Sequence, residues 1–135
     1  MEDPLFAPNE YLNRNITLDE INSIVMHAKS KPASGFEEIP YSVLKFPVMI
    51  ETSLQLFQLI LDTSLIPSIW RKAVICPILK DTSSDTRLSM NYRGVSLLSC
   101  ISKLYSTFIN KRITHYLENQ DILADEQNGF RKIDL

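Results

Sequence analysis

Residues 70–98 decide the fold of this chain, and they read WRKAVICPILK (70–80), DTSSDTRLSMN (81–91) and YRGVSLL (92–98). The β-branched run 73–79 predicts a strand. Pro77 within it indicates an edge strand, because proline cannot donate to a hydrogen-bonded ladder. A polar, turn-rich segment separates this run from a second predicted strand over 92–98. The two strands predict an antiparallel β-hairpin with Lys80 and Arg93 near its tip.

Helical patterns surround the hairpin. Thr17 and Glu20 form a capping box, so a helix is expected to begin there and to stop before Pro32. Apolar residues at helical spacing predict further helices over 41–46, 47–62 and 99–119. In the helix over 47–62 the apolar stripe is wide enough to predict deep burial, with Leu59 among its members. The expected fold is therefore α+β: mostly helical, with one small antiparallel hairpin.

Two segments are expected to be irregular. Residues 1–16 are rich in proline and asparagine, which predicts a loosely held N-terminal segment ahead of one domain over 17–135. Residues 32–40 predict a loop, with Gly35 as the position for a positive φ angle.

Composition excludes several classes. The chain has 135 residues, of which 44% are hydrophobic, and no apolar run approaches the ~20 residues of a membrane span. The acidic start, broken by Pro4, is not a signal peptide. Cys76 and Cys100 are therefore expected to be reduced thiols in an intracellular chain, cytoplasmic or nuclear.

Charge is uneven along the chain. The formal net charge is −2, yet residues 70–112 carry eight basic side chains against two acidic ones. A local excess of this size can attract phosphate. From charge alone, a solvated basic face is the favoured alternative.

The sequence offers no self-contained catalytic set. His27 and His115 stand alone, which favours structural roles, and no metal-ligating or nucleophile motif accompanies them. The hairpin cations Lys80 and Arg93, flanked by Arg71, Lys72 and Arg87, can hold a triphosphate or a nucleic-acid backbone. The alternative is that they are ordinary exposed hairpin charges.

Five segments, in order, carry a resemblance to a known family. They are PASGFEEIP (32–40), IPSIW (66–70), WRKAVICPILK (70–80), NYRGVSLLS (91–99) followed by Lys103, and QNGFR (127–131). In this order and at these spacings they resemble the reverse transcriptase of non-LTR, LINE-type retrotransposons. The similarity runs from about residue 17 to residue 131.

The resemblance implies the fingers part of a right-hand polymerase. It places Lys80 and Arg93 on the triphosphate of the incoming nucleotide. It places a second group along the nucleotide and template: Gln127, Gly129, Phe130 and Arg131. Nucleic-acid contacts are expected for Arg71, Lys72, Arg87 and Lys103. The implied partners are an RNA template or DNA/RNA hybrid and a dNTP.

The sequence departs from the family pattern at positions that bear on polymerase activity. The palm motifs, whose aspartates bind two Mg²⁺ ions in the full-length family enzyme, are expected after Arg131, and the sequence holds no adjacent Asp-Asp pair. Gly94 replaces the proline of the family motif, and Glu37 replaces an aspartate. We therefore expect a truncated fragment without a cofactor of its own, inactive as a polymerase when alone.

Three alternatives remain open at this point. The basic stretch predicts a non-catalytic RNA- or DNA-binding module. Helices without a palm to pack on predict uncovered apolar surface over 47–62 and 99–119, and hence a protein-interaction remnant that self-associates. The reading frame can also be one that yields no stable protein.

Overall fold

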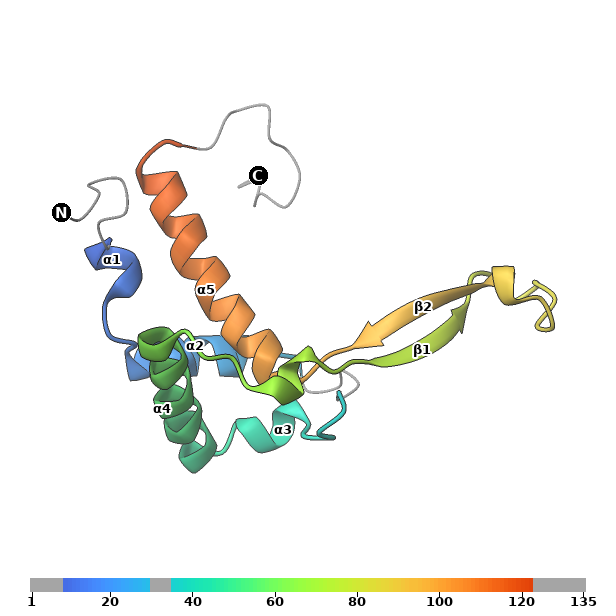
Figure 1. Cartoon of the computed structure of the whole chain (residues 1–135), viewed down its shortest axis with the longest axis horizontal. Helices are drawn as coiled ribbons and strands as arrows, with labels where there is room; N and C mark the ends of the chain where they lie inside the picture. Colours follow the sequence, from blue (N-terminus) through green and yellow to red (C-terminus); the bar gives the residue numbers. More distant parts are fainter. Residues whose placement is uncertain (1–8, 30–34, 123–135) are drawn as a thin grey trace.

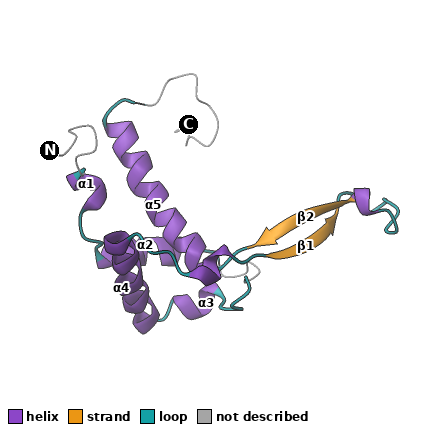
Figure 2. Ribbon diagram, in the orientation of Figure 1, coloured by secondary structure: helices purple, strands orange, loops and turns teal. Residues whose placement is uncertain are grey.

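A helical body and a projecting two-stranded arm make up the chain (Figure 1). The computed structural model describes residues 9–29 and 35–122. These hold five α-helices and one antiparallel sheet, which confirms the predicted α+β class (Figure 2). The helices are α1 (Glu10–Asn13), α2 (Leu18–His27), α3 (Tyr41–Leu44), α4 (Pro47–Thr63) and α5 (Cys100–Asn119). The strands are β1 (Val74–Leu79) and β2 (Tyr92–Leu97), and the 3₁₀ turns are η2 (Ser68–Arg71) and η3 (Ser89–Asn91).

The core lies where α2, α4 and α5 meet. Phe57 of α4 and Phe108 of α5 are fully buried, with ring centroids 6.4 Å apart. Trp70, from η2, meets Phe57 edge-on at 6.5 Å. The turn that leads into the hairpin is thus fixed to the aromatic core.

The predicted helix starts are confirmed at α2 and α4. The Thr17 hydroxyl accepts from the Glu20 amide at 3.3 Å, and the Glu20 carboxylate accepts from the Thr17 amide at 3.0 Å. Pro47 occupies the first turn of α4, where its missing N–H costs no intrahelical bond. The helix expected over 41–46 is shorter and ends at Leu44.

The predicted burial of two helices needs correction. Leu59 on α4 is 58% exposed, and Ile113 on α5 is 43% exposed, although both belong to the apolar patterns. The buried stripe of α5 instead runs Leu104, Phe108, Arg112, and Arg112 is 3% exposed. The buried stripe thus contains an arginine, while the neighbouring Ile113, which the apolar pattern assigned to the core, is exposed.

Arg112 uses all five of its N–H groups. Nε donates to Glu20 Oε1 and Nη2 to Glu20 Oε2, both at 3.0 Å. The remaining three bonds go to the carbonyl oxygens of Leu12 (3.0 Å), Arg14 (2.7 Å) and Asn15 (3.1 Å). Because a guanidinium has five donors, the group is saturated, which makes its burial tolerable.

The N-terminal segment, expected to be irregular and loosely held, is tied down over residues 9–16; we call this part the N-terminal strap. The Asn9 side chain caps α1 by accepting from the Leu12 amide at 3.0 Å. Ile16 is 7% exposed, and its amide donates to Gln58 of α4 at 2.8 Å. The hydrogen bonds that hold the strap come from Arg112 and Gln58, which are more than 40 residues away in sequence, so local sequence patterns could not predict them.

The hairpin register explains why a proline is tolerated. β1 pairs with β2 from Val74↔Leu97 to Leu79↔Tyr92, and Pro77 lies opposite Gly94. The Lys80 amide donates to the Asn91 carbonyl at 2.8 Å, so hydrogen-bonded pairs fall at every second residue from Lys80. Pro77 therefore lies at a non-bonded pair, where its nitrogen faces away from the partner strand.

Candidate nucleotide and nucleic-acid interface

Lys80 and Arg93 lie on one face of the hairpin, toward its far end. Arg93 is paired with Ile78, and Lys80 follows Ile78 by two residues along the same ladder. Directly opposed residues and residues two apart share a face of an antiparallel pair. Such diagonal neighbours lie roughly 7–8 Å apart. The predicted pair of cations is thus brought together, with both residues exposed.

The two cations differ in how they are held. The Lys80 ammonium donates to the Met90 carbonyl oxygen at 2.7 Å, which fixes its position and leaves two of its three N–H groups for a ligand. Within residues 9–29 and 35–122, Arg93 makes no hydrogen bond or ion pair. Its planar fork is available for bidentate contact with phosphate oxygens.

The loop beyond the strands, residues 81–91, is braced from within. The Asn91 side chain donates to the Asp85 carbonyl at 2.9 Å, and the Tyr92 hydroxyl donates to the Thr86 carbonyl at 2.9 Å. Hydrogen bonds from the Ser83 amide and side chain hold the pKa of the fully exposed Asp81 below its ordinary value. The loop presents Arg87, whose side chain is 90% exposed and bonds only the neighbouring Asp85, at 3.3 Å.

A short loop, residues 35–38, holds the root of the hairpin. Glu37 Oε1 accepts from the Cys100 amide at 3.0 Å, which caps α5 just after β2 ends. The other carboxylate oxygen, Oε2, is buried and has no hydrogen-bond partner within the described residues. On the opposite side, the ammonium of Lys72, just before β1, lies 5.1 Å from the Phe36 ring centroid. One loop therefore contacts both chain segments that lead into and out of the arm.

Gly35 was predicted to have a positive φ, and this prediction is wrong. The loop needs a glycine there because its backbone lies against the backbone of Leu98 and Ser99. Gly35 does not have a positive φ; Glu38 does, at 55°. A Cβ at Gly35 would lie 2.5 Å from the Leu98 carbonyl carbon and from the Ser99 nitrogen. Only glycine lets the loop touch the backbone at the hairpin exit.

Of the other predicted cations, Arg87 lies in the loop at the tip, and the remaining three lie at the base of the hairpin, which we call its root. Arg71 is the last residue of η2, and Lys72 follows it. Lys103, in the first turn of α5, has its ammonium 5.9 Å from the Tyr41 ring centroid. Six residues of strand separate the root from the tip, about 20 Å. The basic stretch thus divides into a tip group and a root group, and Arg112 belongs to neither because Glu20 neutralises it.

The two histidines have structural contacts, and the two cysteines are free thiols. His27 Nδ1 lies 2.6 Å from the Ser23 carbonyl oxygen, and His115 Nε2 lies 2.9 Å from the Asn119 amide nitrogen. Burial raises the pKa of the Cys100 thiol, and Cys76 and Cys100 are both free. Among the described residues no group of three His, Cys, Asp or Glu could hold a metal ion. The same part of the chain has no helix that is both long and apolar enough to cross a membrane.

Part of the predicted site lies outside the described residues. This applies to Gln127, Gly129, Phe130 and Arg131. The sequence signals that found Lys80 and Arg93 could not have found Glu37 as a cap or Arg112 as a buried anchor, because both act on partners more than 60 residues away.

Comparison with known proteins shows which sequences this chain resembles. The chain is 31% identical, over 119 residues, to the probable RNA-directed DNA polymerase from transposon BS of Drosophila melanogaster. It is 30% identical, over 114 residues, to the probable RNA-directed DNA polymerase from transposon X-element of the same organism. The chain is related to these transposon polymerases. The resemblance to the reverse transcriptases of non-LTR retrotransposons is thereby confirmed.

The relationship to the transposon polymerases covers most of this chain and little of theirs. The two alignments take in 87% and 83% of the chain, but the chain spans only 13% and 12% of the lengths of the relatives. No protein-family model matches the chain.

Proposed function

We propose that this chain is the fingers portion of an RNA-directed DNA polymerase, and that its hairpin contacts the incoming nucleotide and the template. The two transposon polymerases that it resembles support the reaction class. The observation that carries the proposal is the arm itself. Lys80 and Arg93 share one face near the end of a hairpin that projects from the helical body (Figure 1).

The chemistry of the pair suits a triphosphate. A fixed ammonium supplies a point charge, and an unpaired guanidinium supplies a bidentate fork. Cations near a transferring phosphoryl group stabilise the charge that develops there. In this proposal Lys80 and Arg93 bind the phosphates, while Arg71, Lys72, Arg87 and Lys103 contact the nucleic-acid backbone.

The chain alone is not expected to polymerise. Two-metal phosphoryl transfer needs carboxylates that hold both ions. The sequence has no adjacent Asp-Asp pair, and among residues 9–29 and 35–122 no three His, Cys, Asp or Glu side chains come together. Primer extension on an RNA template with Mg²⁺ should give no product. Product that disappears in an Arg93→Ala variant would overturn this part of the proposal.

Binding tests the remaining part. Fluorescence anisotropy of a labelled DNA primer on an RNA template should show salt-dependent binding by the chain. The Lys80→Gln and Arg93→Gln variants should each weaken it and lower the salt slope by about 0.7–0.9, the loss of one phosphate contact. Lys45→Gln removes the same charge from a groove between α2 and α4 and serves as the control. Equal binding by all four proteins would refute the role given to the hairpin.

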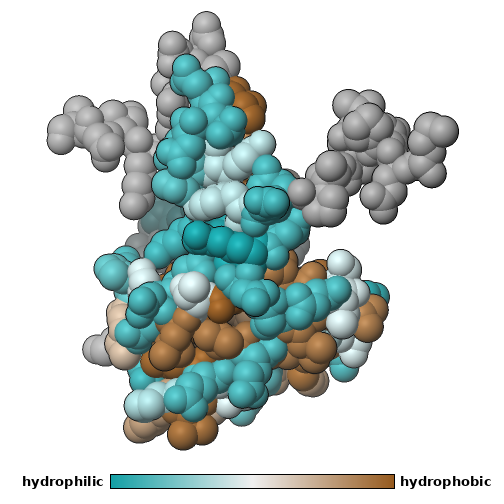
Figure 3. All heavy atoms as spheres, turned by 90° about the vertical axis from the view of Figure 1, so that its left-hand side faces the viewer, coloured by the Kyte–Doolittle hydropathy of each residue, from teal (hydrophilic) through white to brown (hydrophobic). Residues whose placement is uncertain are grey.

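A second candidate function is protein association. On α2 and α4 several large apolar side chains are at least half exposed: Leu18, Met26, Val48 and Leu59. Figure 3 shows hydrophobic residues gathered on the lower half of one face of the molecule. Light scattering tests this candidate, since a monodisperse monomer at high concentration would exclude self-association.

A further inference from the structure

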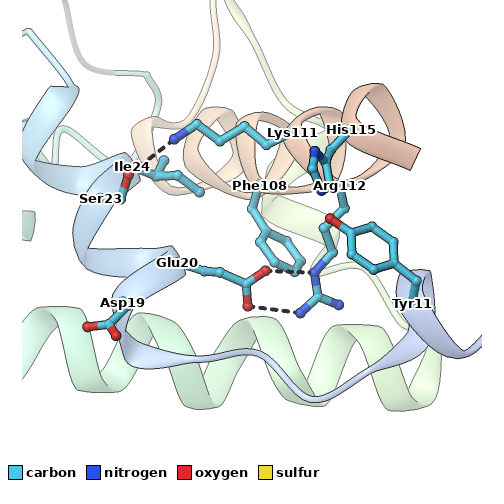
Figure 4. A pocket seen from close by; sticks show the side chains of 9 residues that line it. All are labelled: Tyr11, Asp19, Glu20, Ser23, Ile24, Phe108, Lys111, Arg112 and His115. Carbon is cyan, nitrogen blue, oxygen red and sulfur yellow. Dashed lines mark hydrogen bonds and ion pairs between the residues drawn. The ribbon is translucent and has the colours of Figure 1, made fainter. Parts of the chain in front are cut away.

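A groove separates α2 from α5 on the helical body, away from the hairpin. It consists of two hollows of about 480 Å³ and 330 Å³ that share Ile24 and Lys111 in their walls. Figure 4 shows the larger one, with Lys111 reaching across to Ser23 of α2 at 3.3 Å. The motif residues of the hairpin take no part in this groove.

One stripe of α5 follows the groove and is basic. Lys103, Thr107, Lys111 and His115 recur at every fourth residue, and positions four apart lie on one side of a helix. From the first to the last this stripe is about 18 Å long. Thr107 and Lys111 line the smaller hollow, and His115 lines the larger one.

The end of α2 adds more positive character opposite this stripe. His27 and Lys29 line the smaller hollow together with Lys111, and none of the described residues in its wall is acidic. The His27 ring is held in place by a 2.6 Å contact between its Nδ1 and the Ser23 carbonyl oxygen one turn earlier, and the lysines supply the positive charge of this hollow. Within the described residues Lys29 makes no hydrogen bond or ion pair.

The two ends of the groove differ in charge. At the larger hollow, Asp19 and Glu20 are present (Figure 4), and Arg112 is saturated by its five hydrogen bonds. At the smaller hollow, no carboxylate of the residues that the structure describes stands beside the lysines in its wall. The smaller hollow therefore attracts an anion, whereas the carboxylates at the larger hollow repel it.

The smaller hollow is connected to the root of the hairpin. Tyr41 forms part of its wall, and the Lys103 ammonium lies 5.9 Å from the Tyr41 ring. The same loop that leads into Tyr41 carries Phe36, which is 54% exposed and lies under Lys72. Cations thus follow one another from the arm to the groove.

We infer that the smaller hollow between α2 and α5 is a second phosphate-binding surface, which binds the backbone of the nucleic-acid strand that the hairpin contacts. Lys29 and Lys111 bind phosphate oxygens as point charges, and Lys103 joins this surface to the root of the hairpin. The choice of a nucleic acid as the occupant rests on the proposed function. The groove itself contributes affinity without reading sequence.

The test measures binding of a short fluorescein-labelled oligouridylate as a function of salt, alone and annealed to a complementary DNA strand. The Lys29→Gln/Lys111→Gln variant should bind roughly tenfold more weakly at low salt, with a slope reduced by about 1.4 for a single strand. Lys45→Gln should match the unsubstituted chain. Polyglutamate, a polyanion without phosphate, should compete poorly.

A direct readout accompanies the binding curves. Acetylation of lysines by a soluble ester, mapped by mass spectrometry, should show Lys29 and Lys111 protected by the oligouridylate and Lys45 not protected. Both substituted lysines are exposed, so an unchanged thermal melt will confirm that the variant is folded.

The outcomes separate the groove from the hairpin. If the groove variant binds normally while Lys80→Gln and Arg93→Gln weaken binding, the groove inference is overturned and the proposed function stands. If the groove variant weakens binding and its lysines are protected, the inference is supported even where the hairpin variants have no effect. If the unsubstituted chain binds no oligonucleotide at low salt, or if polyglutamate competes equally well, a nucleic-acid role for the groove is refuted.

Discussion

Replacing Arg112 by methionine would test whether the N-terminal strap depends on this one side chain. Arg112 is 3% exposed and joins α5 to Glu20 and to three carbonyl oxygens of the strap. Methionine keeps the unbranched shape of the stem and its packing beside Phe108, whose ring centroid lies 4.5 Å from the guanidinium carbon. The substitution therefore removes the hydrogen bonds and the charge while it preserves most of the packing.

The expected cost follows from the groups left without a partner. Removing one member of a buried ion pair typically destabilises a protein by about 3–5 kcal/mol. Glu20 is 21% exposed, so water can reach its carboxylate and the lower end of that range, about 3 kcal/mol, is expected. Small domains have only about 5–15 kcal/mol in total, so the effect should be large in a urea titration.

The pKa of Glu20 gives an independent estimate of the same interaction. Burial alone would raise the pKa, but hydrogen bonds from Arg112 and Thr17, with the charge of Arg112 and a bond from Arg14, lower it from 4.5 to about 2. Such a displacement corresponds to at most about 3 kcal/mol, and solvent screening of this partly exposed group reduces it to about 2 kcal/mol. Since the folded-state pKa is the lower one, this stability is present above about pH 4.5 and is lost as the pH falls toward 2.

The assay is urea unfolding at pH 7 and at pH 3 of four proteins: the unsubstituted chain, Arg112→Met, Glu20→Gln and the double variant. The acid-dependent loss due to Glu20 should be absent from Glu20→Gln, and the two substitutions should be strongly non-additive. Arg87→Met, which breaks only an exposed ion pair, should change the free energy of unfolding by less than about 0.5 kcal/mol. An Arg112→Met variant within about 1 kcal/mol of the unsubstituted chain, or additive effects, would refute the reasoning.

Three further predictions concern single positions. Gly35→Ala should destabilise the chain by about 1–3 kcal/mol in urea titration, because its Cβ would meet the Leu98 backbone at 2.5 Å; an unchanged midpoint would show that the root loop can move away. Thr17→Ala should cost about 1 kcal/mol by losing the cap of α2, with Thr17→Ser as the control that retains it. In thiol titration at pH 8 with a disulfide reagent, Cys100 should react only as fast as the chain opens, since it is fully buried and burial raises its pKa, whereas the partly exposed Cys76 should react at once; two fast thiols would contradict the described packing.

Local signals were sufficient for the elements. The capping box at Thr17, the proline at the start of α4 and the strand–turn–strand pattern each act over a few residues, so the sequence predicts them without knowledge of the fold. The same holds for the pair Lys80 and Arg93. Once the two strands pair, the period of two puts both side chains on one face.

Packing decided the rest, because it joins residues far apart in sequence. The apolar period of α5 assigned Ile113 to the buried face and left Arg112 among the basic side chains; Glu20 and the strap carbonyls, 92–100 residues away, made Arg112 the buried one. Gly35 was expected to supply a positive φ, and it instead supplies room for the backbone 63 residues further along. Leu59 fits the apolar stripe of α4 but lies on the side that no described element covers.

The sequence by itself thus determined α2, α4, α5, the hairpin and the relationship to transposon polymerases, since these depend on local pattern and residue order. It did not predict α1, which lies in the segment expected to be irregular. Only the tertiary structure decided which cations are available. Arg112 is paired with Glu20, Lys80 is fixed by the Met90 carbonyl, and Lys29 and Lys111 line the same hollow. The sequence gives the number of charged side chains. Whether a given one can bind a ligand depends on the groups that folding brings close to it.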